Sequence, residues 1–164
     1  MLIVADAGPL IYLSAIGQLE LLRRLHDRVL VPRTVFDEVV ESGTGLPGSK
    51  EVAAARWLEI LSVDAGDPVL RTLLSVLDAG EAAALALARR ENADLVLIDE
   101  RRGRAAARRL GLSVQGTLGV LVRAKRTGVI DKVEPQLRAL LDAGFWMSDE
   151  VVHRTIVAAG EGAA

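Results

Sequence analysis

The chain has 164 residues, 51% of them hydrophobic, and a formal net charge of −2 at pH 7. This length suits one well-buried core, so we expect a single domain over residues 1–160 and a frayed tail over residues 161–164. The absence of cysteine excludes disulfides, thiolate nucleophiles and cysteine-ligated zinc. The two histidines, His26 and His153, lie far apart in the sequence, and we expect solvent-exposed or capping roles for them.

Charge is distributed unevenly along the chain. Residues 37–100 hold thirteen acids and five bases, whereas residues 100–132 hold nine bases and two acids. Such a basic region next to an acidic one is typical of proteins that bind a phosphate-bearing polymer. No apolar stretch reaches membrane-spanning length, and no basic segment followed by an apolar one opens the chain. We therefore expect a cytoplasmic protein that is not embedded in a membrane.

The hydrophobic pattern alternates between strands and helices from one end of the chain to the other. Strands are predicted at 2–6, 28–31, 59–63, 94–98 and 112–114. Helices are predicted within 9–26 and at 33–42, 49–57, 67–75, 79–91, 101–110, 117–127, 133–142 and 148–159. This alternation predicts an α/β fold, a three-layer α/β/α sandwich with a mostly parallel central sheet.

Two of these strands end in an aspartate. Asp6 follows the apolar run 2–5 and Asp99 follows the matching run 95–98. In open α/β sheets ligands bind at the carboxyl ends of the strands, which favours a functional role for both side chains. Each aspartate also precedes a predicted helix, so helix capping is the competing interpretation.

Two glutamates stand on predicted helices near the same edge of the sheet. Glu38 lies on helix 33–42, where a solvated helix face is the simpler interpretation. Glu81 opens an alanine-rich helix, and Asp78 three residues earlier completes the pattern of a capping box. Four independent caps need not converge, whereas a metal site requires acids from separate segments to meet. Because only oxygen ligands are available, such a site would favour magnesium or manganese.

The order of these acids and the strings around them resemble the PIN-domain family, including the VapC-like toxins of bacterial toxin–antitoxin pairs. The resemblance covers about residues 2–155 and is carried by the four acids and by three strings: Asp78-Ala79-Gly80-Glu81-Ala82, Leu97-Ile98-Asp99-Glu100-Arg101-Arg102-Gly103-Arg104 and Gly116-Thr117-Leu118-Gly119. Relatives often carry Ser or Thr where this chain has Ala7, and a further acid beyond the fourth, for which Glu100 is the candidate.

The resemblance implies a magnesium- or manganese-dependent ribonuclease. Asp6, Glu38, Glu81 and Asp99 would be the catalytic and metal-binding residues, and one or two ions would promote attack of water on RNA phosphodiesters. Arg101, Arg102 and Arg104 are candidates for contact with the substrate phosphate. The same resemblance implies a possible role as the toxin of a toxin–antitoxin pair, with an antitoxin protein as partner, and a homodimer.

A different class of function stays open from the residues alone: a catalytically inactive module that binds RNA or a protein partner. Phe145 and Trp146 could anchor a partner, although core packing is the simpler interpretation of this pair. The segment Gly43–Gly48 matches a dinucleotide-binding string formally, but it follows a helix instead of a strand. We predict a loop there.

Overall fold

The structure is a computed structural model that describes residues 1–162, and its centre is a five-stranded sheet in which every pair of strands is parallel. The spatial order is β3-β2-β1-β4-β5. The strands are β1 (Leu2–Ala5), β2 (Arg28–Pro32), β3 (Leu58–Leu61), β4 (Leu95–Leu97) and β5 (Val114–Gln115). The predicted α/β fold is therefore confirmed, and the predicted mostly parallel sheet is parallel throughout.

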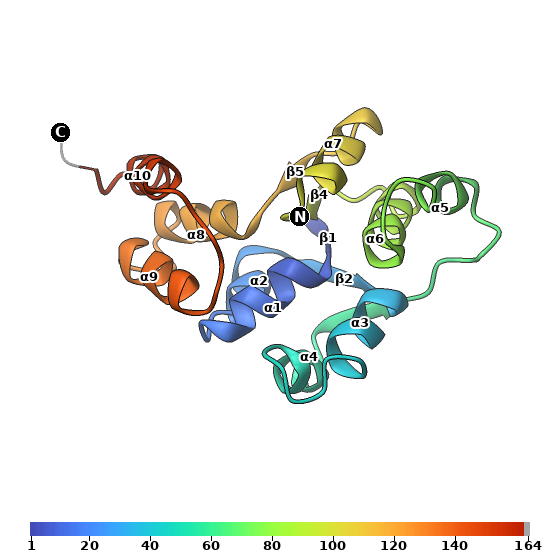
Figure 1. Cartoon of the computed structure of the whole chain (residues 1–164), viewed down its shortest axis with the longest axis horizontal. Coiled ribbons are helices and arrows are strands. Elements are labelled where there is room, and N and C mark those ends of the chain that lie inside the picture. Colours follow the sequence, from blue (N-terminus) through green and yellow to red (C-terminus); the bar gives the residue numbers. More distant parts are fainter. Residues whose placement is uncertain (163–164) are drawn as a thin grey trace.

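Helices cover both faces of this sheet (Figure 1). They are α1 (Ala7–Ala15), α2 (Glu20–Leu25), α3 (Arg33–Val40), α4 (Ser49–Ala54), α5 (Pro68–Leu73), α6 (Ala79–Arg90), α7 (Arg101–Arg109), α8 (Thr117–Arg126), α9 (Glu134–Asp142) and α10 (Asp149–Ala158). Each predicted helical segment contains a helix of the structure. The main difference among the strands is β5, which lies two residues later in the chain than predicted.

The core is divided by the sheet into two apolar clusters. Successive residues of β1 face opposite sides, so Ile3 and Ala5 pack with α1, α2 and α8, whereas Val4 packs with α5, α6 and α7. Strands buried on both faces need continuous apolar sequences, which β1 and β4 have. The result is the three-layer arrangement that the alternating pattern predicts.

Helix α6 packs most deeply against the second face. All residues from Gly80 to Ala88 are buried, and Leu85 and Leu87 are fully inaccessible to solvent. Burial of each leucine side chain stabilises the fold by about 1.5–3 kcal/mol. The five alanines between Ala82 and Ala88 have short side chains, so the helix axis can approach the sheet closely. This packing brings the first turn of α6 beside the ends of the central strands.

The direction of the chain across the sheet reverses between β1 and β4. From β1 the order proceeds to β2 and β3 on one side, and the later strands β4 and β5 lie on the other side. Such a topological switch point leaves a crevice at the carboxyl ends of the two strands that flank it. Asp6 and Asp99 follow those two strands, and α3 contacts α6 near the same edge. The fold therefore assembles the acidic residues at the switch point.

The segment between α9 and α10 differs in part from the expectation of core packing. The rings of Phe145 and Tyr12 meet edge to face with centroids 4.9 Å apart, so Phe145 does contribute to packing. Trp146, however, is 83% exposed, and the prediction that it packs in the core is wrong. Residues 43–48 form a loop, as predicted.

The C-terminal tail lies partly outside the described residues. Within its described part, the carboxylate of Glu161 accepts hydrogen bonds from the backbone N–H groups of Val133 and Glu134. Among residues 1–162, none of the helices is long and apolar enough to span a lipid bilayer.

The environment of His26 differs from the predicted exposed or capping role, whereas His153 is exposed as expected. The side chain of His26 is 5% exposed, and neither ring nitrogen has a hydrogen-bond partner. Burial, followed by the positive charges of Arg123 and the N-terminus, lowers the pKa of His26 to about 4. The sequence offers no sign of this because the surrounding shell comes from distant segments.

We expect His26→Leu to reduce the acid sensitivity of the fold. The neutral imidazole contributes stability above its unfolded pKa of about 6.5, and this contribution is lost as the pH falls towards 4. Removing two unpaired buried nitrogens should also stabilise the variant by about 1 kcal/mol. Thermal unfolding at pH 8 and pH 5 measures the effect. The stability advantage of the variant should be larger at pH 5, and an equal advantage at both pH values would contradict this explanation.

Candidate active site

Asp6 lies at the carboxyl end of β1 and is 6% exposed. It occupies the position before α1, yet its side chain forms no capping hydrogen bond with that helix. The competing interpretation from the sequence, a helix cap, therefore does not account for this buried carboxylate. Its backbone N–H instead donates to the carbonyl of Leu97 at 2.9 Å, which ties the end of β1 to β4.

Glu38 reaches the same place from α3. A Cβ atom added at Gly80 would lie 2.7 Å from Oε2 of Glu38 and 3.6 Å from Oδ1 of Asp6. The two carboxylates thus face each other across the first turn of α6, and a larger residue than glycine at position 80 would push against Glu38. The sequence favoured a solvated role for Glu38; the side chain is exposed, but its end lies at the acidic cluster.

Glu81 and Asp78 form the capping box that the sequence predicts. The backbone N–H of Glu81 donates to Oδ1 of Asp78 at 2.8 Å, and the N–H of Asp78 donates to Oε2 of Glu81 at 3.4 Å. Glu81 is only 6% exposed, and its other oxygen lies 3.4 Å from the position of a Cβ added at Gly103 on α7. One oxygen of Glu81 therefore serves the cap while the other points towards α7.

Asp99 is fixed by the start of α8. The backbone N–H of Thr117 donates to Oδ1 at 2.7 Å, and the Thr117 hydroxyl donates to Oδ2 at 2.7 Å. Thr117 is fully buried, so both hydrogen bonds are shielded from water. Asp99 does not cap α7, the helix that follows it; Glu100 occupies the N-cap position there. This two-point contact orients the Asp99 carboxylate.

Arg104, one of the three candidates for phosphate contact, is half-buried and lies beside Asp99. Its guanidinium donates to the carbonyl of Ile98 at 3.1 Å. A Cβ added at Gly116 would lie 2.8 Å from Oδ1 of Asp99 and 2.9 Å from Nη1 of Arg104, so the two groups share one small space. The positive charge of Arg104 therefore lies near Asp99 and opposes the rise of its pKa, whereas Arg101 and Arg102 are exposed.

The acids form two neighbouring groups. Asp6, Glu38, Asp78 and Glu81 influence one another electrostatically, whereas the charged neighbours that influence Asp99 are Arg104 and Glu100. Gly8, two residues after Asp6 in the chain, lies beside Asp99, because a Cβ added there would lie 3.1 Å from Oδ2 of Asp99. Among residues 1–162, no three acid or histidine side chains lie close enough to form a metal-binding group.

Burial dominates the electrostatics of Asp6. Together with the smaller effects of the charges on Glu81, Asp78 and Glu38, it raises the pKa of Asp6 from 3.8 to about 7. The N–H of Ala7 lies near enough to oppose this rise without forming a cap. The pKa values of Glu38, Glu81 and Asp99 are also raised, in each case mainly by burial. A cation at this edge would relieve the cost of ionising all four groups.

Two contributors were missed or only half recognised in the sequence. The sequence indicates only a capping role for Asp78, although its charge also raises the pKa values of Asp6, Glu38 and Glu81. Its place one helical turn before Glu81 was the available signal. Thr117 stood in the string Gly116–Gly119, but its contact with Asp99 joins residues eighteen positions apart, which spacing alone does not reveal.

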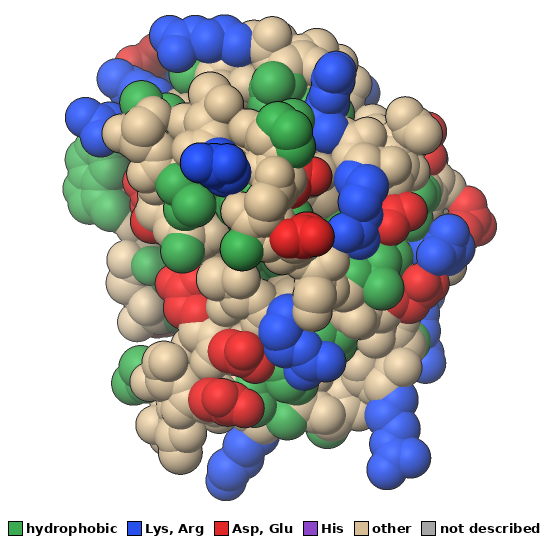
Figure 2. Space-filling view, turned by 90° about the vertical axis from the view of Figure 1, so that its right-hand side faces the viewer, with side chains coloured by type: hydrophobic (Ala, Val, Ile, Leu, Met, Phe, Trp, Pro, Cys, Tyr) green, Lys and Arg blue, Asp and Glu red, His purple; other side chains and the backbone are tan. Residues whose placement is uncertain are grey.

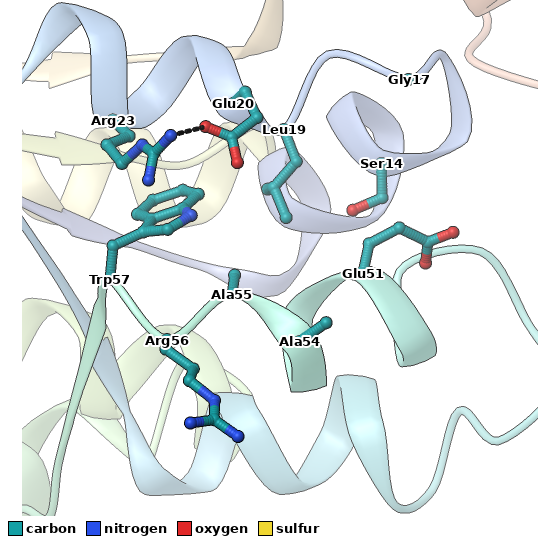
Figure 3. Close-up of a pocket in the computed structure, with 10 residues that line it drawn as sticks. All are labelled: Ser14, Gly17, Leu19, Glu20, Arg23, Glu51, Ala54, Ala55, Arg56 and Trp57. Carbon is teal, nitrogen blue, oxygen red and sulfur yellow. Dashed lines mark ion pairs between the residues drawn. The ribbon is translucent and has the colours of Figure 1, made fainter.

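Another hollow, of about 520 Å³, lies away from the acids (Figure 3). It is bounded by the end of α1, the start of α2 and the segment after α4, and Trp57 forms one wall. Arg23 lies 6.0 Å from the centre of the Trp57 ring and pairs with Glu20 at 3.0 Å. None of the four predicted site residues lines this hollow, so it is not part of the acidic site.

We expect Asp6→Asn to stabilise the metal-free protein at high pH. Protonated Asp6 favours the fold, and this contribution is complete below about pH 4 and lost as the pH rises through about 7. The shift corresponds to at most about 4 kcal/mol. In thermal unfolding with a chelator, the melting temperature of the variant should therefore exceed that of wild type at pH 8 and lie close to it at pH 4. A variant that is less stable at pH 8 would contradict the assignment.

We expect Gly116→Ala to displace Asp99 while leaving the fold intact. Gly116 has an extended backbone, with φ −101°, so alanine adds no backbone strain, but its Cβ would crowd both Asp99 and Arg104. Manganese affinity, measured by calorimetry, should fall at least about tenfold. Gly66→Ala is the control, because a Cβ there has only an ordinary contact of 3.5 Å. Equal affinity in both variants would show that the position of Asp99 is not critical.

Comparison with known proteins gives a family for this arrangement. No curated protein matches the chain. A family model described as a PIN domain matches residues 2–161, which is nearly the whole chain. The match agrees with the parallel sheet, with the acids at its switch point and with the resemblance found in the sequence. The chain therefore belongs to the PIN-domain family, which has a nuclease-type fold.

Proposed function

We propose that this chain is a magnesium- or manganese-dependent ribonuclease that hydrolyses RNA phosphodiesters at the switch point of its sheet. The observation that carries the proposal is the buried Asp6 carboxylate, surrounded by Glu38, Asp78 and Glu81. Evolution towards stability alone would not place three acids around one buried carboxylate, because like charges in a low-dielectric site repel one another. A divalent cation bound by these carboxylates would offset the repulsion between them.

The donor set fits such a cation by its chemistry. All the groups at the site are carboxylate or hydroxyl oxygens, the ligands that magnesium and manganese prefer. Asp6 and Asp99 would hold the ion as principal ligands, and Glu38 and Glu81 would act as ligands or through water. Since Asp99 has other charged neighbours than Asp6, an ion held by both would draw the two groups of acids together. When bound, one or two such ions activate the attacking water and neutralise charge at the phosphate.

The residues of the chain have separate tasks in this proposal. Thr117 holds both oxygens of Asp99 and leaves its remaining lone pairs for a ligand. The two hydrogen bonds of the capping box with Asp78 keep Glu81 at the first turn of α6. Glu38, which is exposed, can orient water at the entrance. Water adds to phosphorus, the bond to one ribose oxygen breaks, and that oxygen takes up a proton, so no covalent bond to the protein is needed.

One observation favours the second candidate function, an inactive module that binds RNA or a protein partner. Both oxygens of Asp99 are already engaged by Thr117, and no complete ligand group is assembled among the described residues. Such a module would bind its partner regardless of metal and would tolerate Asp99→Asn. The role as a toxin, the antitoxin partner and the homodimer stay predictions from the resemblance.

Manganese titration followed by calorimetry tests the proposal without knowledge of the natural substrate. We expect wild type to bind manganese, and Asp6→Asn and Asp99→Asn each to lose binding by at least about a hundredfold. Asp142→Asn, an exposed acid at the end of α9, is the control and should bind as wild type does.

The same four proteins are then compared for cleavage of a mixed-sequence single-stranded RNA. Cleavage should require manganese or magnesium and should be at least about a thousandfold slower in the Asp6 and Asp99 variants than in Asp142→Asn. RNA binding that is insensitive to metal, together with an absence of cleavage in wild type, would favour the inactive module.

A further inference from the structure

A groove leads away from the acidic site along α7. Two hollows of about 520 Å³ each adjoin there, and they share Val76, Leu77 and Arg102 as lining residues. The first hollow is at the acids, where Asp78, Glu81 and Glu100 line it. The second continues along the helix and is lined by Ser75, Ala105, Ala106 and Arg109. One continuous depression therefore joins the carboxylates to the far end of α7.

The two walls of this groove differ in chemistry. On the α7 side, Arg102 and Arg109 are seven residues apart, which places them on one helix face about 10 Å apart. On the opposite side, the turn before α6 supplies Leu77 and the 58% exposed Val76. Figure 2 views the molecule from the side of α5 and shows basic side chains, Lys or Arg, next to acidic ones on that face of the molecule. A charged wall opposite an apolar one suits a molecule with anionic groups along one edge and apolar faces along the other.

A single nucleic-acid strand has this character, since phosphates follow one edge and base faces the other. Each hollow has the volume of a site for one drug-sized group, which corresponds to about one nucleotide. Glu81, which lines the first hollow, is only 6% exposed, so a scissile phosphate that approaches it must enter a recess. A flexible strand can enter it, whereas the phosphates of a stiff duplex stay on its outer surface.

We propose that single-stranded RNA leaves the acidic site through the groove between residues 75–78 and α7, with Arg102 and Arg109 binding successive phosphates and Val76 contacting a base. This proposal rests on the ribonuclease function proposed above. Arg104 has no part in it, because its guanidinium is turned towards Ile98 and Asp99. Since no aromatic residue lines the two hollows, base contacts are weak and the groove contributes little sequence preference.

Binding of a labelled twelve-nucleotide RNA, measured by fluorescence anisotropy at several salt concentrations, tests the arginines. In this binding assay, calcium is used in place of manganese, because calcium also binds carboxylate oxygens. Each phosphate contact contributes about 0.7 to the slope of log affinity against log salt. Arg102→Gln and Arg109→Gln should each reduce the slope by about that amount and weaken binding several-fold. Arg108→Gln is the matched control, an exposed arginine of the same helix that lies outside the groove. Its slope should stay that of wild type.

The absence of cysteine allows a second readout that does not depend on charge. Val76→Cys carries a single thiol in the groove, and Leu46→Cys carries one in the exposed loop 43–48 as a control. Single-stranded RNA should slow the reaction of a thiol reagent with Val76→Cys at least about fivefold and leave Leu46→Cys unaffected. A duplex of the same sequence should protect much less.

The outcomes separate this inference from the proposed function. The groove alone would be overturned if wild type cleaves RNA but the groove variants show no effect. In that case Arg102→Gln and Arg109→Gln would bind RNA with the same salt dependence as Arg108→Gln, and RNA would not protect Val76→Cys. Equal protection by duplex would overturn the assignment to a single strand. Protection by polyglutamate as strong as by RNA would assign the groove to an acidic protein instead. Failure of wild type to bind or cleave any RNA would overturn both proposals.

Discussion

The repulsion among carboxylates around Asp6 is the constraint on which the rest of the site depends. A carboxylate at the end of a buried strand loses solvation, and its neighbours on α3 and α6 add like charge. The apolar packing of α6 against the sheet supplies the free energy that holds these groups together. The site therefore stores an unfavourable interaction that a cation can relieve, and this links stability, pH and metal binding in one small region.

Glycines make this crowding possible. Gly8, Gly80, Gly103 and Gly116 each lie where a Cβ atom would approach a side chain of the site, at 2.7–3.4 Å from an oxygen of one of the four acids. They come from four separate segments, so close approach is a property of the whole site and not of one turn. Among these close neighbours, Thr117 fixes the orientation of Asp99, because it donates a hydrogen bond to each carboxylate oxygen.

Much of the fold could be predicted from the sequence because its signals are local. The apolar runs that end in Asp6 and Asp99, and the capping box of Asp78 and Glu81, each lie within one short segment. Their period and caps suffice to identify strands and helix starts. Predictions for isolated side chains were less successful. Trp146 is exposed and His26 is buried, since the surroundings of each depend on residues that approach from distant parts of the chain.

The sequence by itself determined the succession of strands and helices and the parallel sheet, because hydrophobic period and strand ends are visible in adjacent residues. Through the family resemblance it also predicted the four acids as the candidate site. Only the tertiary structure decided which acids share a charge environment, that Asp78 joins them, and that Thr117 holds Asp99. It also decided that Arg104 turns towards the carbonyl of Ile98, whereas Arg102 and Arg109 line a groove. These outcomes depend on distances between segments, which are set by how the helices pack on the sheet.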